Sequence, residues 1–406
     1  MSRQPMLDVV VVGAGVVGAA TALAFARDGL RVALVESREP ARWQASAPDL
    51  RVYAFAPDNA ALLDDLGVWD SIRAARLQPY RAMRIWDAAG GGELVFDADR
   101  LGQAQLGWIV ENGLLVDRLW AALPGAGVEL HCPDAATALE QDDDGAVLAL
   151  ESGRRLRARL VVAADGADSP VRAMAGIEAP RHDYGQRGLV AYIDHEQPHQ
   201  ATCWQRFLPG GPLAFLPVAD GRCSIVWTLP DAEAERVLQL ADDAFLRELE
   251  RAFDARLGAL TATSPRAAFP LRRQLAREFL RGRVLLAGDA AHGRSRVPGL
   301  PLPDQPLVRA RAGPDLQRRL PRSARVQAPA LDGSARAGSV GGDLGADRAD
   351  VRADPERRRD GTIGQVPTKR QVIVTGDQFI GAQATFDQDN RPAVAVELDQ
   401  AGGRAM

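Results

Sequence analysis

Three glycines and a glutamate near the start of the chain have the types and spacing of a phosphate-binding turn. Gly13, Gly15 and Gly18 follow the apolar run of residues 8–12, and Glu36 ends the next apolar run. Gly13 permits a tight turn, Gly15 lets the backbone approach a pyrophosphate, and Gly18 lets a helix pack closely on a strand. Glu36 stands where an acid accepts hydrogen bonds from ribose hydroxyls. The pattern predicts a dinucleotide site at a helix N-terminus.

The same stretch has two alternative interpretations. Residues 9–26 carry no charge and end in Ala24-Phe25-Ala26, which resembles a signal peptidase site, and their length is close to that of a membrane span. Neither alternative explains the glycine spacing or the second apolar run that ends at Glu36. A strand–turn–helix–strand unit is therefore the favoured interpretation.

Two later strand ends also carry acids. Asp165 and Gly166 follow an apolar run, so that Asp165 can hydrogen-bond a ribityl or ribose hydroxyl while Gly166 leaves room for a cofactor chain. The alternative is a simple turn with Ser169 as a helix N-cap. Asp289 ends a third apolar run, where ligands bind in parallel sheets. His292 has no identifiable Ser, Cys or carboxylate partner, so a capping or packing role is favoured over catalysis.

These turns need elements to position them. The apolar spacing predicts helices over residues 57–77 (ending near Gly67), 112–123 and 233–256. Short apolar runs over 128–163 predict a small sheet. Residues 213–229 predict a β-hairpin that turns at Asp220-Gly221.

Composition limits the class of protein. The 406 residues, 46% hydrophobic, suffice for two or three domains, and a formal charge of −4 gives no preference for nucleic acid. The three cysteines are an odd number without metal-ligand spacing. We therefore expect no metal site and a reducing, cytoplasmic location.

The three motifs together resemble a known family. The order Gly-x-Gly-x-x-Gly, Asp-Gly-x-x-Ser-x-x-Arg and Gly-Asp-Ala-Ala-His is similar to that of flavoprotein aromatic hydroxylases of the para-hydroxybenzoate hydroxylase type. The closer resemblance is to the ubiquinone-biosynthesis UbiH/UbiF/VisC group, over residues 5–292. Supporting stretches are Val110-Glu-Asn112, residues 204–217 and residues 269–273. The resemblance implies an α/β fold: an FAD-binding Rossmann-type domain with an inserted α+β substrate sheet.

The resemblance also implies ligands and residue roles. FAD would be the cofactor and NAD(P)H the co-substrate, with molecular oxygen and a hydrophobic phenolic or quinol ring as substrates. The FAD contacts would be Gly13, Gly15, Gly18, Glu36, Arg51, Asp165, Gly166 and Asp289. Asp165 and Gly166 would also meet the nicotinamide nucleotide. No catalytic side chain is identified. Peripheral association with the inner membrane or with other enzymes of the pathway is compatible with the resemblance.

The chain departs from the family after His292. The family continues with a proline and a Gly-Gln-Gly-x-Asn loop, and neither Gly-Gln-Gly nor an asparagine occurs near this position. Residues 293–362 contain no aromatic residue and no Ile, Met or Cys. Such a composition predicts disorder, and it is typical of a GC-rich gene translated out of frame. An arginine-rich tail that binds a partner is the alternative.

The last part of the chain has strand-like runs again. Residues 366–406 resemble part of the periplasmic region of the SecD protein-export subunit. The predicted organisation is therefore an FAD-binding domain (1–180 and 265–292), a substrate sheet and helix (181–264), a disordered segment (293–365) and a SecD-like fragment (366–406). Three functions remain open: a hydroxylase, a flavin oxidoreductase that inserts no oxygen, and a non-catalytic remnant or fusion protein.

Overall fold

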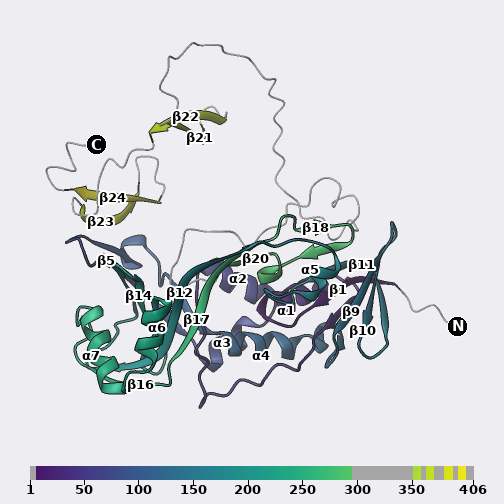
Figure 1. Ribbon diagram of the computed structural model, residues 1–406, viewed down its shortest axis with the longest axis horizontal. Coiled ribbons are helices and arrows are strands. Elements are labelled where there is room, and N and C mark those ends of the chain that lie inside the picture. The colour runs from purple at the N-terminus through teal and green to yellow at the C-terminus, as the bar shows by residue number, and fades with distance from the viewer. Residues whose placement is uncertain (1–5, 295–350, 358–362, 370–378, 387–391, 399–406) are drawn as a thin grey trace, which may run out of the picture.

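Two large β-sheets lie toward opposite ends of the long axis of the molecule (Figure 1). The computed structural model describes residues 6–294, 351–357, 363–369, 379–386 and 392–398. No helix within these residues is long and apolar enough to cross a membrane. Residues 9–26, for which a signal peptide and a membrane span were the alternatives, form most of a strand of the first sheet and most of the helix that follows it.

The first sheet has the order β18-β19-β11-β1-β2-β8, and the hairpin β9–β10 continues from β11. Strands β19, β11, β1, β2 and β8 are parallel neighbours. Their apolar, β-branched sequences suit strands that are covered on both faces. The bounds are β1 Leu7–Val12, β2 Val32–Val35, β8 Glu129–His131, β9 Ala136–Gln141, β10 Ala146–Leu150, β11 Arg155–Ala163, β18 Leu280–Arg281 and β19 Val284–Leu286.

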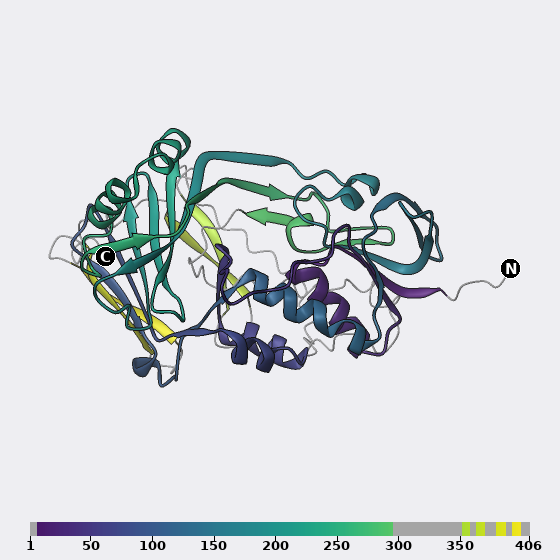
Figure 2. The ribbon, with the colours of Figure 1, turned by 90° about the horizontal axis from the view of Figure 1, so that it is seen from below.

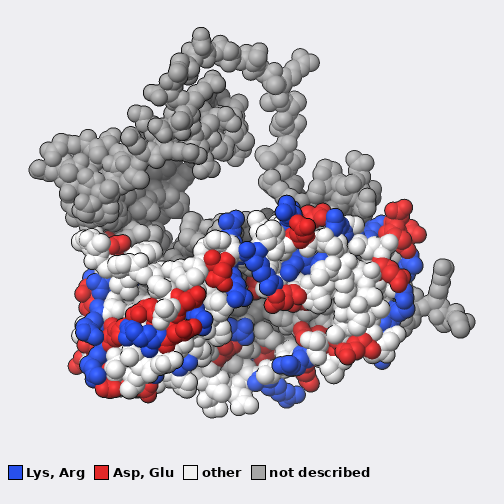
Figure 3. Space-filling model, viewed as in Figure 1, with Lys and Arg blue, Asp and Glu red and all other residues white. Residues whose placement is uncertain are grey.

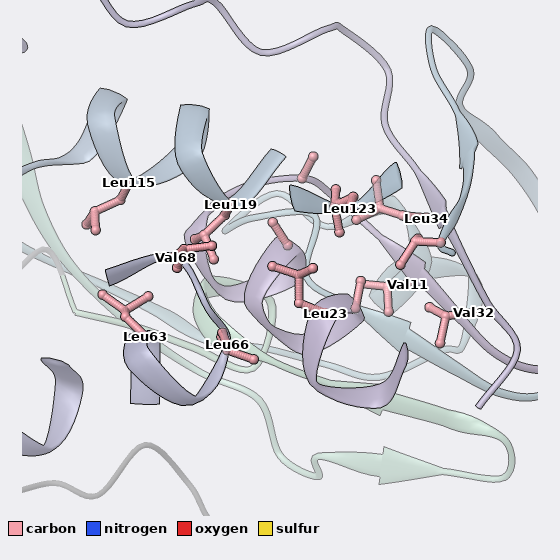
Figure 4. Close-up of a cluster of buried hydrophobic side chains, with 14 of the residues drawn as sticks. Val11, Leu23, Val32, Leu34, Leu63, Leu66, Val68, Leu115, Leu119 and Leu123 are labelled. Atoms are coloured by element: carbon pink, nitrogen blue, oxygen red, sulfur yellow. The ribbon is translucent and has the colours of Figure 1, made fainter. Parts of the chain in front are cut away.

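Helices cover one face of this sheet, and α1 and α4 lie side by side on it (Figure 2). Side chains of β1 alternate between two cores, so that Val11 packs with Leu23 of α1 and Leu119 of α4 (Figure 4). On the other face, Val10 packs with Leu148 of β10 and the short helix α5. The bounds are α1 Val16–Arg27, α2 Pro57–Asp65, α3 Trp69–Ala75, α4 Asn112–Ala122, α5 Pro170–Met174 and the 3-10 turns η2 Pro124–Ala126 and η3 Gly288–Ala290.

The second sheet has the order β20-β17-β12-β15-β14-β13-β5-β6-β23-β24, with β16 paired to β12. Its pairs are antiparallel except β13–β5 and β6–β23. Helices α6 and α7 pack on one face. The bounds are β5 Ala82–Asp87, β6 Glu93–Asp97, β12 Arg181–His195, β13 Thr202–Leu208, β14 Gly211–Pro217, β15 Cys223–Pro230, β16 Leu260–Thr263, β17 Ala267–Leu275, β20 His292–Arg294, β23 Phe379–Phe386, β24 Pro392–Leu398, α6 Asp231–Leu238 and α7 Asp242–Ala252.

A three-stranded sheet packs against the face of the second sheet opposite α6 and α7. It has the order β3-β7-β4, and Val52 of β3 and Ile109 of β7 pack with Tyr192 and Leu216 of the second sheet. The bounds are β3 Val52–Phe55, β4 Gln78–Tyr80, β7 Gly107–Glu111 and the 3-10 turn η1 Asp99–Leu101. This small sheet places the residues around position 51 between the two large sheets.

Several predicted elements are confirmed and others need correction. Helix 112–123 and the hairpin at residues 213–229 are confirmed. The predicted end of a helix near Gly67 is confirmed, since α2 ends at Asp65 and Gly67 has φ +72°. The remaining residues up to 77 were not predicted as a helix of their own, and they contain α3. The predicted helix over 233–256 is two helices, α6 and α7. The strands of 128–163 form no separate sheet, since all of them join the first sheet.

The predicted division into domains stays a prediction, to which the topology adds two facts. Residues 82–97 form strands of the second sheet, although they precede residue 181. The hairpin of β21 Val351–Arg357 and β22 Ile363–Lys369 spans the predicted boundary at residue 365. Residues 295–350, most of the segment predicted to be disordered, lie outside the described residues.

Candidate functional site

Four of the predicted site segments lie at one edge of the first sheet. The parallel strands β19, β11, β1 and β2 are consecutive neighbours, and they lead into Asp289, Asp165, Gly13 and Glu36 respectively. The chain passes from β1 to β2 on one side and returns to β11 on the other. Ligands of open parallel sheets bind at such a reversal of strand order, beyond the carboxyl ends of the strands.

The glycine turn separates residues that the fold requires from one that it does not. Gly13 has φ +101°, and a Cβ there would lie 2.4 Å from the carbonyl oxygen of Ala164. A Cβ on Gly18 would lie 2.0 Å from the carbonyl oxygen of Gly13. At Gly15, by contrast, a Cβ would meet no atom within 4 Å. Gly15 is the N-cap of α1, so the space in front of it is open at a helix N-terminus, where backbone amides favour a phosphate.

Glu36 reaches from the end of β2 back to the glycine turn. Its Oε2 accepts a hydrogen bond of 2.7 Å from the amide of Ala14, and its Oε1 accepts one of 3.0 Å from the amide of Arg38. The carboxylate is half-buried. It is thereby held beside the turn, as a residue that recognises a ribose must be.

Asp165 has an unpaired oxygen. Its Oδ2 accepts a hydrogen bond of 3.1 Å from the amide of Val171, whereas its buried Oδ1 has no partner among the described residues. Burial raises the pKa of this carboxyl group, and the hydrogen bonds it accepts oppose the rise. Gly166, next to it, has φ +89° and open space at its Cβ position. A free acceptor beside open space fits the hydroxyl groups of a cofactor.

Arg172 ties two of the carboxyl-end turns together. Its guanidinium donates hydrogen bonds of 2.9 Å to the carbonyl of Ala290 in η3 and 2.8 Å to the carbonyl of Ala167. Buried Gln274 donates to the same Ala167 carbonyl at 2.9 Å. Ser169 caps α5, as predicted, by accepting a hydrogen bond from the amide of Arg172. The turn and the binding-site interpretations of this segment are therefore compatible.

We expect Arg172→Ala to lower the free energy of unfolding by about 2–4 kcal/mol, since the buried carbonyl of Ala290 would lose its charged donor and the carbonyl of Ala167 would lose one of its donors. Urea unfolding measures this. Arg181→Ala is the matched control, because Arg181 also donates to the Ala167 carbonyl but its side chain is 42% exposed. The control should cost less than about 1 kcal/mol. Equal losses in the two variants would contradict the role given to Arg172.

The negative charge of Asp289 acts on Tyr53. Burial raises the pKa of Tyr53, and the negative charge of Asp289 adds to that rise. Partial desolvation likewise raises the pKa of Asp289, while nearby His292 opposes it. The ring centroid of His292 lies 6.1 Å from that of Phe279, which fits the packing role that the sequence predicts.

Arg51 is positioned by a network that the sequence did not reveal. Asp49 accepts hydrogen bonds from the amide of Gly113 at 3.0 Å and from Asn112 Nδ2 at 3.2 Å, so it holds the start of α4. The hydroxyl of Tyr53 donates to Asn112 Oδ1 at 3.1 Å. Arg51 lies between Asp49 and Tyr53 with its side chain 63% exposed. The pair Glu111-Asn112, at the junction of β7 and α4, was the only sequence signal for this network.

Charges of both signs are mixed on the face of the molecule shown in Figure 3, with no extended region of one sign.

Comparisons with known proteins agree with this geometry. A family model described as an FAD binding domain matches residues 6–300. The 3-demethoxyubiquinol 3-hydroxylase of Escherichia coli (strain K12) is 38% identical over 294 residues, which cover 72% of this chain and 74% of that protein. The ubiquinone hydroxylase UbiL of Rhodospirillum rubrum is 37% identical over 302 residues, covering 73% and 69%. The crystal structure of p-nitrophenol 4-monooxygenase PnpA from Pseudomonas putida DLL-E4 aligns with a TM-score of 0.57 at 25% identity, covering 72% and 74%.

A second family model, the P1 head subdomain of SecDF, matches residues 353–406. The predicted SecD-like resemblance of residues 366–406 is confirmed. Its start is corrected to residue 353, so the match includes β21 and β22.

Proposed function

The chain belongs to the family of FAD-dependent monooxygenases that share this FAD-binding domain, and we propose that it hydroxylates a polyprenylphenol or quinol intermediate of ubiquinone biosynthesis. The observation that carries the cofactor assignment is the open space in front of Gly15, bordered by the turns after β1, β2, β11 and β19. The similarity to ubiquinone-pathway hydroxylases over 72% of the chain supports the substrate class.

The roles of the site residues are part of this proposal. The amides at the start of α1 would bind the FAD pyrophosphate, for which Gly15 leaves room. Glu36 would accept hydrogen bonds from the adenosine ribose. Asp165 and Asp289 would accept them from hydroxyls of the cofactor chain, and Arg51 would contact FAD from the β3 side. When bound, FAD supplies electron transfer from NAD(P)H and the activation of molecular oxygen.

The protein's own contribution is binding, orientation and shelter from water. Arg172 links the turns of Asp165 and Asp289 through its hydrogen bonds to Ala167 and Ala290. Helix α1 directs its positive end to the pyrophosphate, which favours the anionic cofactor. Such groups act by position, so oxygen insertion does not depend on an acid–base side chain among the site residues that the structure describes.

Two measurements on the full chain test the proposal. The purified protein should contain close to one FAD per chain. With NAD(P)H, a polyprenylphenol and ¹⁸O₂, the product should carry one ¹⁸O atom. FAD without labelled product would favour the oxidoreductase alternative, and a colourless protein that takes up no FAD would favour the non-catalytic one.

A further inference from the structure

One buried amide in the second sheet lacks any hydrogen-bond partner. Gln205 of β13 is 2% exposed, and neither its Nε2 nor its Oε1 has a partner among the described residues. A buried polar group left unpaired has given up its hydrogen bonds to water without a replacement, which destabilises the folded state. Native proteins rarely accept that cost unless the group has another partner during function.

The alternating directions of the side chains along β13 show on which face of the sheet Gln205 lies. Trp204 packs with Phe253 beside α7, and Arg206 donates a hydrogen bond of 3.0 Å to the carbonyl of Ala252 at the end of that helix. Successive side chains of a strand point to opposite faces. Gln205 therefore belongs to the face opposite α6 and α7, which is also the face that packs against β3 and β7.

The neighbours of Gln205 on this face are apolar. In register, it stands between Ile85 of β5 and Ala214 of β14. The row continues through Val226 and Val190. Gln205 is thus the one polar residue in a row of aliphatic side chains.

This row is itself buried, and the next row along the strands contains two exposed phenylalanines. Leu50, which directly precedes Arg51, packs with Val190 and Val226. In the next row, Phe207 and Phe269 remain 40% and 48% exposed. The aliphatic row that contains the amide thus packs against the residue next to Arg51, which we assign to the cofactor.

We propose that the amide of Gln205 is the hydrogen-bond partner of the oxygen substituent on the aromatic ring of the substrate, an inference that rests on the proposed function. Its Oε1 would accept from the phenol hydroxyl and its Nε2 would donate to the same or a neighbouring ring oxygen. The aliphatic row and the exposed phenylalanines would hold the ring and the prenyl chain. A site of this kind discriminates strongly against a ring that lacks the oxygen, because its own amide then stays unpaired.

The test compares two ligands and three variants of the FAD-loaded full chain. The ligands are 2-geranylphenol and geranylbenzene, and tryptophan fluorescence reports their dissociation constants. Gln205→Leu should weaken the phenol about 10- to 100-fold and the hydrocarbon less than about twofold. Gln205→Asn, which keeps a shorter amide, should recover part of the phenol affinity. Gln239→Leu, the same change at the exposed end of α6, should alter neither constant.

Each outcome bears on a separate claim. Failure of the unchanged chain to bind FAD would count against the proposed function itself. Normal FAD binding with equal phenol affinity in Gln205→Leu would overturn only the role of Gln205, as would equal weakening of both ligands. The leucine variant should also unfold at the same or a higher temperature without ligand. A clear fall would show that the amide is already paired in the free protein, for instance by a buried water, and would overturn the inference.

Discussion

Gly15→Val is expected to weaken FAD binding at least about 100-fold while the protein stays folded. A Cβ at Gly15 would meet no protein atom within 4 Å, and the backbone there is extended, with φ −63° and ψ 176°, which valine adopts readily. The side chain would fill the space in front of α1. It would thus keep the pyrophosphate from the helix amides, and charge-assisted hydrogen bonds contribute about 1.5–3 kcal/mol each. Titration of the apoprotein with FAD, followed by flavin fluorescence, measures the loss.

Gly18→Val is the informative contrast. A side chain there would overlap the carbonyl oxygen of Gly13, so this variant should lose the fold together with the cofactor. Circular dichroism distinguishes the two variants, since only Gly15→Val should keep the spectrum of the unchanged chain. The poorer N-cap should lower its free energy of unfolding by only about 1 kcal/mol. A folded Gly15→Val protein with normal FAD content would remove the basis for placing the pyrophosphate at this turn.

The elements that were predictable from sequence are those whose signals are local. The unit from β1 to β2 was visible because apolar strands, glycine spacing and a terminal acid occur within 29 residues, from Asp8 to Glu36. The hairpin β14–β15 was visible because Asp220-Gly221 is a turn signal between two apolar runs. Helix bounds were less predictable: the amphipathic pattern of residues 233–256 continues across the break at residues 239–241, although the backbone helix does not.

The features that were not predictable depend on contacts between distant residues. The sequence placed Arg172 within a motif but gave no sign that its guanidinium would bond Ala290, 118 positions later. Nor did it show that Asp49 would hold the start of α4, or that Gln205 would be buried without a partner. The sheet to which a strand belongs was unpredictable for the same reason. Strand β5 joins the second sheet through parallel pairing with β13, which is more than 100 residues away in the sequence.

Poor coupling of NAD(P)H oxidation to hydroxylation is the other large effect that we expect. The residues after His292 do not carry the family's Gly-Gln-Gly-x-Asn loop, whose amides would stabilise negative charge at the cofactor. Around the site, Tyr53 is 39% exposed and Phe269 is 48% exposed, so water has access to the face on which the substrate would lie. Oxygen chemistry that is open to water yields side products. We therefore expect less than about a tenth of the NAD(P)H consumed to appear as hydroxylated product, with hydrogen peroxide accounting for most of the rest.

The measurement is a balance of three quantities in one reaction: NAD(P)H consumed, hydrogen peroxide released and hydroxylated polyprenylphenol formed. A chimaera that replaces residues 293–406 with the corresponding segment of the Escherichia coli 3-demethoxyubiquinol 3-hydroxylase is the control, because it exchanges the segment that departs from the family pattern and keeps residues 1–292. The chimaera should couple better than the chain itself if solvent access and the missing amides cause the loss. Tight coupling in the unchanged chain would contradict this expectation. It would show that residues 293–406 exclude water from the site and stabilise the negative charge in place of the family's loop.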